Sequence, residues 1–130
     1  MYLIILLGMI FCHIIDDFYL QGILAQMKQK QWWVQNAPGN LYENDYKIAL
    51  MFHAFSWVCS IHIPIVIHIA YCDWYYNTIA VLIIFIIDWL IHAIVDDLKA
   101  NKKVINLVQD QTIHLIQIIA TWFLYCKVVM

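Results

Sequence analysis

Four long apolar stretches, separated by shorter polar segments, make up most of the chain. They cover about residues 2–25, 48–71, 75–97 and 105–129. Each is close to the roughly 20 residues that a helix needs to cross the hydrocarbon core of a bilayer. The stretches are continuously apolar and lack two-residue alternation, which excludes the strands of a membrane barrel. The pattern predicts an all-α protein with one domain, residues 1–130, built as an integral membrane four-helix bundle.

The composition supports a membrane environment. Hydrophobic residues make up 65% of the chain and charged residues 12%, against averages of about 45–50% and about 25% in globular domains. A small soluble domain buries only about 60–70% of the surface that its unfolded chain exposes, so it cannot hide this much apolar surface. The expected partner is therefore the lipid bilayer. A net charge of -2 gives no basic field for nucleic acid, which is excluded as a partner.

The lysines predict how the chain is oriented. All seven basic residues are lysines, and six of them lie in two connections, between the first and second stretches and between the third and fourth. Only Lys127 lies on the other side. Because positively charged connections stay in the cytoplasm, both termini are expected to be non-cytoplasmic, in a bacterial inner (cytoplasmic) membrane. Lys28 and Lys99 are interpreted as interfacial anchors, with contact to a phosphate as the alternative.

Acids and histidines inside the apolar stretches are the candidates for chemistry. A carboxylate in the middle of a membrane helix costs about 2.5–3.5 kcal/mol to insert, and such residues are functional candidates by default. Three pairs have a spacing of four residues, which places both members on one helix face. The pairs are His13 and Asp17, His92 and Asp96, and Asp110 and His114; the second stretch adds His53.

All four stretches bring these residues to the cytoplasmic half of the membrane, and helical bundles build metal sites from such inward-facing side chains. Imidazole and carboxylate suit a divalent metal ion of the Zn or Mn type. We expect His13, Asp17, His53, His92 and Asp96 to be metal ligands, and Asp110 and His114 to be catalytic acid–base groups or further ligands. The alternative is that the pairs only join helices, but such contacts average about 0.6 kcal/mol, less than the insertion cost.

Several polar residues have two interpretations or a minor role. Asp110 stands where an N-cap of the last helix would stand, and Asp88 either orients His92 or makes an unrelated polar contact. Asp16 and Asp97 point away from the shared faces and are treated as secondary. His62 and His68 lie farther from the lysines and are interpreted as polar groups near the outer headgroups. The four cysteines form no C-x-x-C pair, so neither a disulfide framework nor a zinc knuckle is expected.

A resemblance to a known family rests on five blocks of the sequence. They are His13-x-x-x-Asp17-Phe18-x-Leu20-Gln21, Lys28, His53, His92-x-x-x-Asp96-x-x-Lys99 and Asp110-Gln111-x-x-His114. Together they resemble the pattern of small bacterial and phage membrane proteins grouped as domain of unknown function 3307, over nearly the whole chain. The resemblance implies a polytopic membrane fold and the same site, but no reaction. A looser likeness to membrane-bound metal-dependent hydrolases is an analogy.

Two classes of function follow from these observations. The first is a metal-dependent hydrolase, in which the metal activates water and polarises a phosphoryl or acyl oxygen of a lipid or another interfacial substrate. The second is non-enzymatic: a proton or metal conduit, or a phage membrane factor that acts through a host partner. A bis-histidine haem would leave the paired aspartates unexplained. A homo-oligomer is also expected, with Ser56-x-x-x-Ser60 as a small-residue contact.

Overall fold

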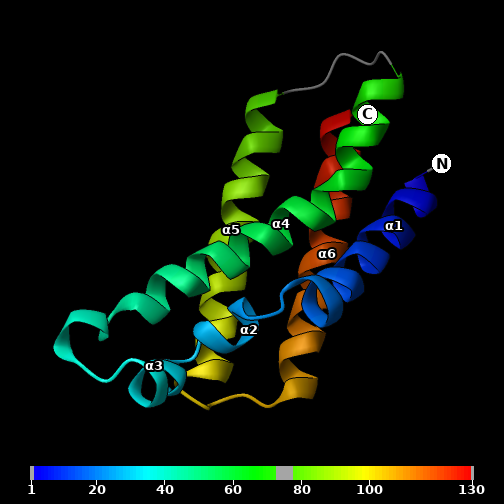
Figure 1. The fold of residues 1–130 in the computed structure, drawn as a ribbon. Helices are drawn as coiled ribbons and strands as arrows, with labels where there is room; N and C mark the ends of the chain where they lie inside the picture. Colours follow the sequence, from blue (N-terminus) through cyan, green and yellow to red (C-terminus); the bar gives the residue numbers. More distant parts are fainter. Residues whose placement is uncertain (1, 73–77, 130) are drawn as a thin grey trace.

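The structure is a computed structural model that describes residues 2–72 and 78–129 (Figure 1). Within these ranges all regular elements are helical, which confirms the all-α prediction. Four long helices are joined by short helical segments. In chain order the elements are α1 Tyr2–Ile15, the π-helix η1 Asp16–Leu20, α2 Leu24–Met27, α3 Lys30–Asn36, the 3₁₀-helix η2 Asn40–Tyr42, α4 Asp45–Cys72, α5 Thr78–Ala100 and α6 Leu107–Val129.

The four long helices surround a shared interior. α1 contacts both α4 and α6, and α5 also contacts both α4 and α6. The short helix α2 packs against α4. In Figure 1 the N- and C-terminal ends of the described chain lie at one end of the molecule, and α3 and the α5–α6 connection lie at the other. The lysine-bearing connections therefore share one end, which is the geometry that the lysine pattern requires.

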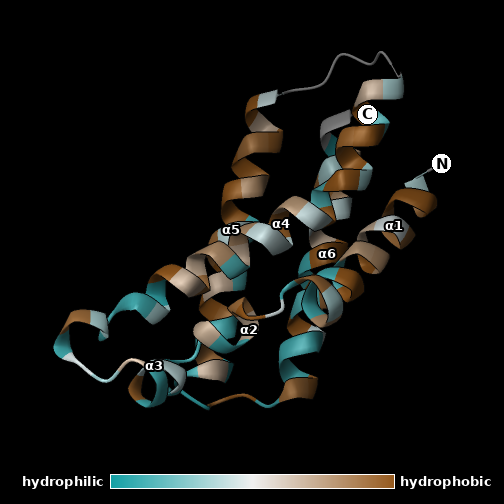
Figure 2. Cartoon of the chain, in the orientation of Figure 1, coloured by the Kyte–Doolittle hydropathy of each residue, from teal (hydrophilic) through white to brown (hydrophobic). Residues whose placement is uncertain are grey.

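Many large apolar side chains of the long helices are exposed, whereas several of their acids and histidines are buried; Figure 2 shows apolar residues along each long helix. On α5 the buried side chains include Asp88, His92 and Asp96, whereas Ile83 and Ile87 are exposed. A soluble domain distributes these residue types the other way. Three segments are long and apolar enough to cross a membrane: Tyr2–Leu20, Asn40–Tyr71 and Thr78–Ala100. Within the described residues α6, the fourth expected crossing, is not among them.

The first expected helix, 2–25, is interrupted in its second half. α1 ends at Ile15, the π-helical turn η1 follows, and Gly22 adopts a left-handed φ of 45°. Glycine reaches this conformation without the steric penalty of a Cβ atom, so the chain turns here and α2 starts in a new direction. The second expected helix begins earlier, at Asp45. The expected turn at Asp73 and the expected start of the third helix at 75 lie outside the described residues.

A close contact between α1 and α4 fixes how the first helix lies in the molecule. Gly8 faces Pro64, and a Cβ atom on Gly8 would lie 3.0 Å from the Pro64 Cγ atom. Pro64 lies inside α4, where it removes a backbone hydrogen bond and favours a bend; α4 changes direction along its length in Figure 1. An apolar core surrounds this contact. It consists of Ile5, Met9, Trp57, Val58, Ile61, Ile65, Ile118 and Tyr125.

Candidate metal centre

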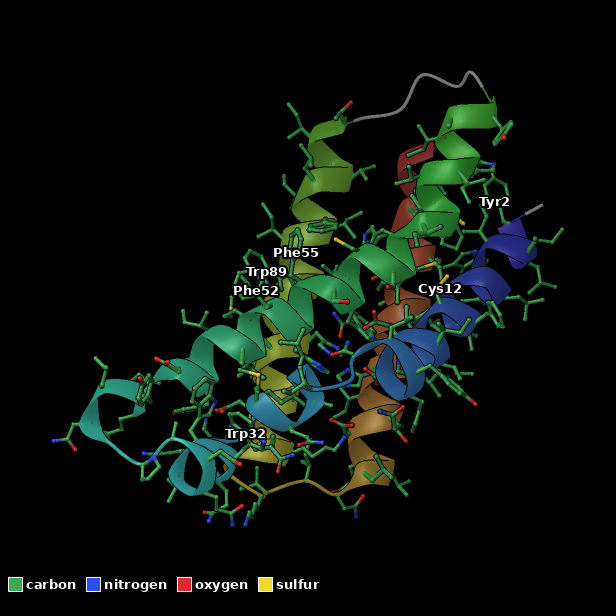
Figure 3. All side chains as sticks on the ribbon, in the orientation of Figure 1. Tyr2, Cys12, Trp32, Phe52, Phe55 and Trp89 are labelled. Atoms are coloured by element: carbon green, nitrogen blue, oxygen red, sulfur yellow. The ribbon has the colours of Figure 1, made fainter. Side chains whose placement is uncertain are left out.

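All seven residues expected at the site line one interior region, and two lysines join them. We call this set the polar cluster. Nitrogen and oxygen atoms of side chains are visible in the interior near α2 in Figure 3. Six of the seven expected residues are at most 2% exposed, and the Asp17 side chain is 10% exposed. The cluster consists of His13 (α1), Asp17 (η1), His53 (α4), His92 and Asp96 (α5), and Asp110 and His114 (α6), with Lys28 after α2 and Lys99 on α5.

The Asp96 carboxylate is the centre of the cluster. Its Oδ2 atom lies 2.6 Å from the Nε2 atom of His53 and 3.5 Å from the Nε2 atom of His92. Its Oδ1 atom lies 3.6 Å from the Nε2 atom of His114. Asp96 thus brings imidazoles from three helices, α4, α5 and α6, around one carboxylate.

Two groups of three side chains have the spacing of metal ligands. The ligand atoms of His92, Asp96 and His114 lie within 4.8 Å of one another, and those of Asp17, His53 and His92 do too. Nitrogen or oxygen ligands about 2.1 Å from a tetrahedral zinc ion are about 3.4 Å apart. The His92–Asp96 and His114–Asp96 distances of 3.5 and 3.6 Å are close to this value. These distances exceed those of ordinary hydrogen bonds.

Several of these ligand atoms have no hydrogen-bond partner. Both ring nitrogens of His92 and both of His114 are buried without a hydrogen bond, as are the Nδ1 atom of His53 and the Oδ1 atom of Asp110, although both Nε2 atoms and Asp110 Oδ1 make ion-pair contacts of 3.4–3.6 Å. Each unpaired buried polar group costs about 1–3 kcal/mol, so native structures rarely keep many. The two fully buried rings are held by stacking: His92 lies 4.1 Å from the Trp57 ring and 4.2 Å from the His114 ring, between centroids. The stacked rings hold the ligand atoms in place, but several of these atoms lack a hydrogen bond.

Lys28 and Lys99 are not surface anchors as the sequence pattern suggested. The Nζ atom of Lys28 lies 2.6 Å from both His53 Nε2 and Asp96 Oδ2, and Lys28 is only 9% exposed. The Nζ atom of Lys99 lies 2.6 Å from an Asp110 carboxylate oxygen. The turn at Gly22 directs α2 against α4, and this brings Lys28 inside. Lys99 follows Asp96 by three residues, which places both on one helix face. This spacing could have predicted that Lys99 belongs to the polar cluster.

The remaining members of the cluster are held by neutral donors. Trp57 donates from Nε1 to the Nδ1 atom of His13, 2.8 Å away. Gln111 donates to carboxylate oxygens of both Asp17 and Asp110, at 3.1 Å in each case. His13 is in neither of the two ligand groups found among the described residues. Its Nδ1 atom accepts the hydrogen bond from Trp57, so only Nε2 remains as a possible ligand atom, and the ligand role of His13 stays a prediction.

Asp110 does not cap α6. The helix begins at Leu107, and Asn106, just before it, forms a reciprocal cap with Gln109 of its first turn. Asn106 accepts a hydrogen bond from the Gln109 backbone, and Gln109 accepts one from the Asn106 backbone. This capping box satisfies the first amides of the helix. The carboxylate of Asp110 is therefore available to the polar cluster, where it lies 3.4 Å from His114 Nε2.

Asp16, treated as secondary on sequence grounds, is completely buried. Its carboxylate accepts hydrogen bonds from Ser56 and Ser60, each at 2.9 Å, and from the Gln21 amide. The two serines therefore face the interior and bind Asp16. Asp97, the other secondary acid, lies outside the polar cluster and pairs with Lys102 at 3.2 Å.

Two further expectations change. His62 and His68 are 3% and 8% exposed, so they are interior residues and do not face outer headgroups. Asp88 bonds to Gln117 and Thr121 of α6, which supports the polar-contact interpretation over a role in orienting His92. The sequence could have predicted that these side chains are buried only if the rotation of each helix about its axis had been known.

Comparisons of the chain with protein-family models, with curated proteins and with solved structures found no match. The resemblance to domain of unknown function 3307 therefore stays a prediction from the motif blocks.

Proposed function

We propose that the protein crosses the membrane four times, through α1, α4, α5 and α6, and binds a divalent metal ion in the polar cluster near the cytoplasmic face. The polar interior and apolar surface of the long helices support the membrane placement. The lysines that flank the cluster support its position near the cytoplasmic face, since positive residues stay on that side. α6 completes the enclosure because it contacts both α1 and α5.

One observation carries the metal proposal. The Nε2 atoms of His92 and His114 are buried without hydrogen-bond partners, yet they lie 3.5 and 3.6 Å from oxygens of Asp96. An ion bound between them would satisfy these atoms at the separation that tetrahedral ligands have. The Asp110 Oδ1 atom, also unpaired and 3.4 Å from His114 Nε2, supplies a fourth ligand.

The donor set favours Zn or Mn. The ligands are imidazole nitrogens and carboxylate oxygens, which suit these borderline and hard ions better than copper(I). Asp17, His53 and His92 offer a second group of ligand atoms. Because His92 belongs to both groups, it is the side chain on which metal binding depends most.

We propose hydrolysis as the reaction. A bound metal ion of this kind lowers the pKa of a water ligand and polarises a phosphoryl or acyl oxygen. The chain supplies further charged groups at the same place: the Lys99 side chain is 30% exposed and reaches inward to Asp110. Its exposed part lies where a substrate would enter the site from water, and its positive charge suits a substrate with an anionic headgroup. A lipid or another interfacial molecule fits a site at this depth.

A non-enzymatic metal-binding role is the second candidate. The observation that favours it is the burial of His92 and His114, both 0% exposed, because a catalytic metal keeps an open position for water or substrate. Purified protein with its metal, assayed on phospholipid vesicles, separates the two roles. Release of headgroup or fatty acid supports hydrolysis, and a metal-loaded protein without such release supports the second candidate.

Metal content of purified variants tests the binding site. His92→Phe keeps an aromatic ring for the Trp57 and His114 stack but removes both ligand nitrogens. We expect the wild-type protein, dialysed against zinc or manganese, to retain metal and His92→Phe to lose it. His68→Phe is the matched control, since His68 is also buried but bonds to Tyr125 outside the polar cluster, and it should retain metal.

The metal-free proteins give a second readout of the same substitution. Phenylalanine at position 92 removes two unpaired buried nitrogens, so metal-free His92→Phe should be at least as stable as metal-free wild type in thermal unfolding. Metal should raise the unfolding temperature of the wild type only. Equal metal content in wild type and His92→Phe, or none in the wild type, would contradict the proposal.

A further inference from the structure

A second pair of titratable side chains lies inside the molecule, apart from the polar cluster. His62 of α4 and Asp88 of α5 are both 3% exposed. The Nε2 atom of His62 lies 3.7 Å from the Oδ2 atom of Asp88. Among the described residues each is the other's only ion-pair partner. We call these two residues the outer pair, since they lie farther from the lysine-bearing connections than the polar cluster does.

The hydrogen bonds of His62 define where its proton is. Its Nδ1 atom lies 2.8 Å from the backbone oxygen of Val58. A carbonyl oxygen can only accept, so Nδ1 must carry a hydrogen and donate it. In a neutral imidazole the other nitrogen, Nε2, then has a lone pair and no hydrogen. That nitrogen faces the Asp88 carboxylate and has no hydrogen-bond partner.

Apart from His62, the described residues that bond to the Asp88 carboxylate are neutral donors. Thr121 donates its hydroxyl to Oδ2, 2.7 Å away, and Gln117 donates its amide to Oδ1, 3.0 Å away. With a neutral His62 and an ionised Asp88, a lone pair would face a carboxylate oxygen across 3.7 Å. This arrangement leaves a buried charge unpaired, which is costly inside a membrane. One additional proton neutralises the unpaired charge. The pair is then either an imidazolium beside a carboxylate or a carboxylic acid beside a neutral imidazole.

We propose that the outer pair binds one proton and passes protons through the apolar part of the molecule. In the transfer step the N–H bond at His62 Nε2 breaks and an O–H bond at Asp88 Oδ2 forms, so the pair stays electrically neutral overall and no electrons are exchanged. The gap of 3.7 Å exceeds a hydrogen bond, so the proton crosses when the side chains approach or when one water molecule bridges them.

A cavity lies beside Asp88, one member of the outer pair. A space of about 300 Å³ between α5 and α6 is lined by Asp88, Gln117 and Thr121, and its other walls are apolar. A water molecule occupies about 30 Å³ in the liquid and needs two or more polar partners to be held. The polar residues at this cavity are Asp88, Gln117 and Thr121, and the last two donate hydrogen bonds to Asp88. On the opposite side the Phe85 ring packs against His62, with 5.1 Å between ring centroids.

Proton flux into vesicles tests the proposal. Purified wild-type protein in liposomes that contain a pH-sensitive dye should dissipate an imposed pH gradient faster than protein-free liposomes do. Asp88→Asn keeps an acceptor for Thr121 and Gln117 and donates to His62 Nε2, but it cannot take up the proton. We expect its flux to fall to the protein-free level, and His62→Gln, as a second variant, to behave in the same way.

Asp97→Asn is the matched control, because it alters an acid on the same helix that lies outside both groups of polar residues, and its flux should equal that of the wild type. The proposal is overturned if wild-type flux does not exceed the protein-free level, if Asp88→Asn conducts like the wild type, or if the control loses flux equally. Asp88→Asn should keep its bound metal, which shows that it is folded. Loss of metal in His92→Phe with intact flux would separate the two proposals.

Discussion

At the scale of single residues, specific partners stabilise several of the buried carboxylates. Asp96 and Asp110 pair with lysines, and Asp16 is held by hydroxyl and amide donors. The four-residue spacing of the His and Asp pairs could be read from the sequence. The roles of Lys28 and Asp16 could not, since both depend on the direction that the chain takes after α1.

Lys28 occupies lone pairs that a metal ion would use. Its ammonium group lies 2.6 Å from both His53 Nε2 and Asp96 Oδ2, so lysine and metal compete for the same atoms. We expect Lys28→Met to bind zinc more tightly than the wild type in a competition titration. The metal-free variant should lose up to about 3–5 kcal/mol of stability, because the buried Asp96 charge keeps its imidazole contacts but loses its ammonium partner.

Lys102→Met serves as the control for this prediction. The Lys102 side chain is 60% exposed and pairs with Asp97 at the surface, where an ion pair contributes about 0–1 kcal/mol. Its zinc affinity should match that of the wild type. Weaker zinc binding in Lys28→Met than in Lys102→Met would show that Lys28 supports the metal and does not compete with it.

At the scale of the elements, the length of the apolar stretches predicts the long helices. It does not predict that the first helix is interrupted. Gly22 was the only local signal for the turn, and a single glycine inside an apolar stretch does not specify one. The π-helical turn at Asp16–Leu20 adds a residue to the helical repeat and precedes that turn. Rotation of each helix about its axis is set by side-chain contacts between helices, which explains why the interior placement of His62 and His68 was missed.

The α1–α4 contact at Gly8 positions the part of α1 that carries His13. A side chain at Gly8 would press on the rigid Pro64 ring, 3.0 Å from the position of Cβ. We expect Gly8→Val to destabilise the protein by about 1–3 kcal/mol, as overpacking does, and to weaken metal binding by moving Asp17. Thermal unfolding and a zinc titration measure the two effects.

Gly39→Val is the matched substitution, since nothing lies within 4 Å of a Cβ atom at Gly39 and its φ of 162° is extended. It should unfold at nearly the wild-type temperature. Equal stability of the two valine variants would show that the Gly8 contact does not position α1.

At the scale of the whole molecule, the polar interior and apolar surface explain why composition alone indicated a membrane protein. Three segments have the length and apolar character of crossings, and we propose α6 as the fourth. An even number of crossings places both termini on one side of the membrane. Reporters fused to each terminus in a bacterial host test this: alkaline phosphatase should be active at both ends and a green fluorescent protein should be dark at both. Reporters on opposite sides would mean three crossings.

The central claim is that buried imidazoles and carboxylates from separate helices bind one divalent ion, and X-ray absorption spectroscopy of the zinc-loaded protein tests it most directly. We expect a first shell of nitrogen and oxygen atoms about 2.0–2.2 Å from zinc, with the outer scattering of histidine rings and without sulfur. In His92→Phe the histidine scattering should be lost together with the metal. Zinc bound through sulfur, zinc surrounded only by water, or an unchanged spectrum in His92→Phe would contradict the account.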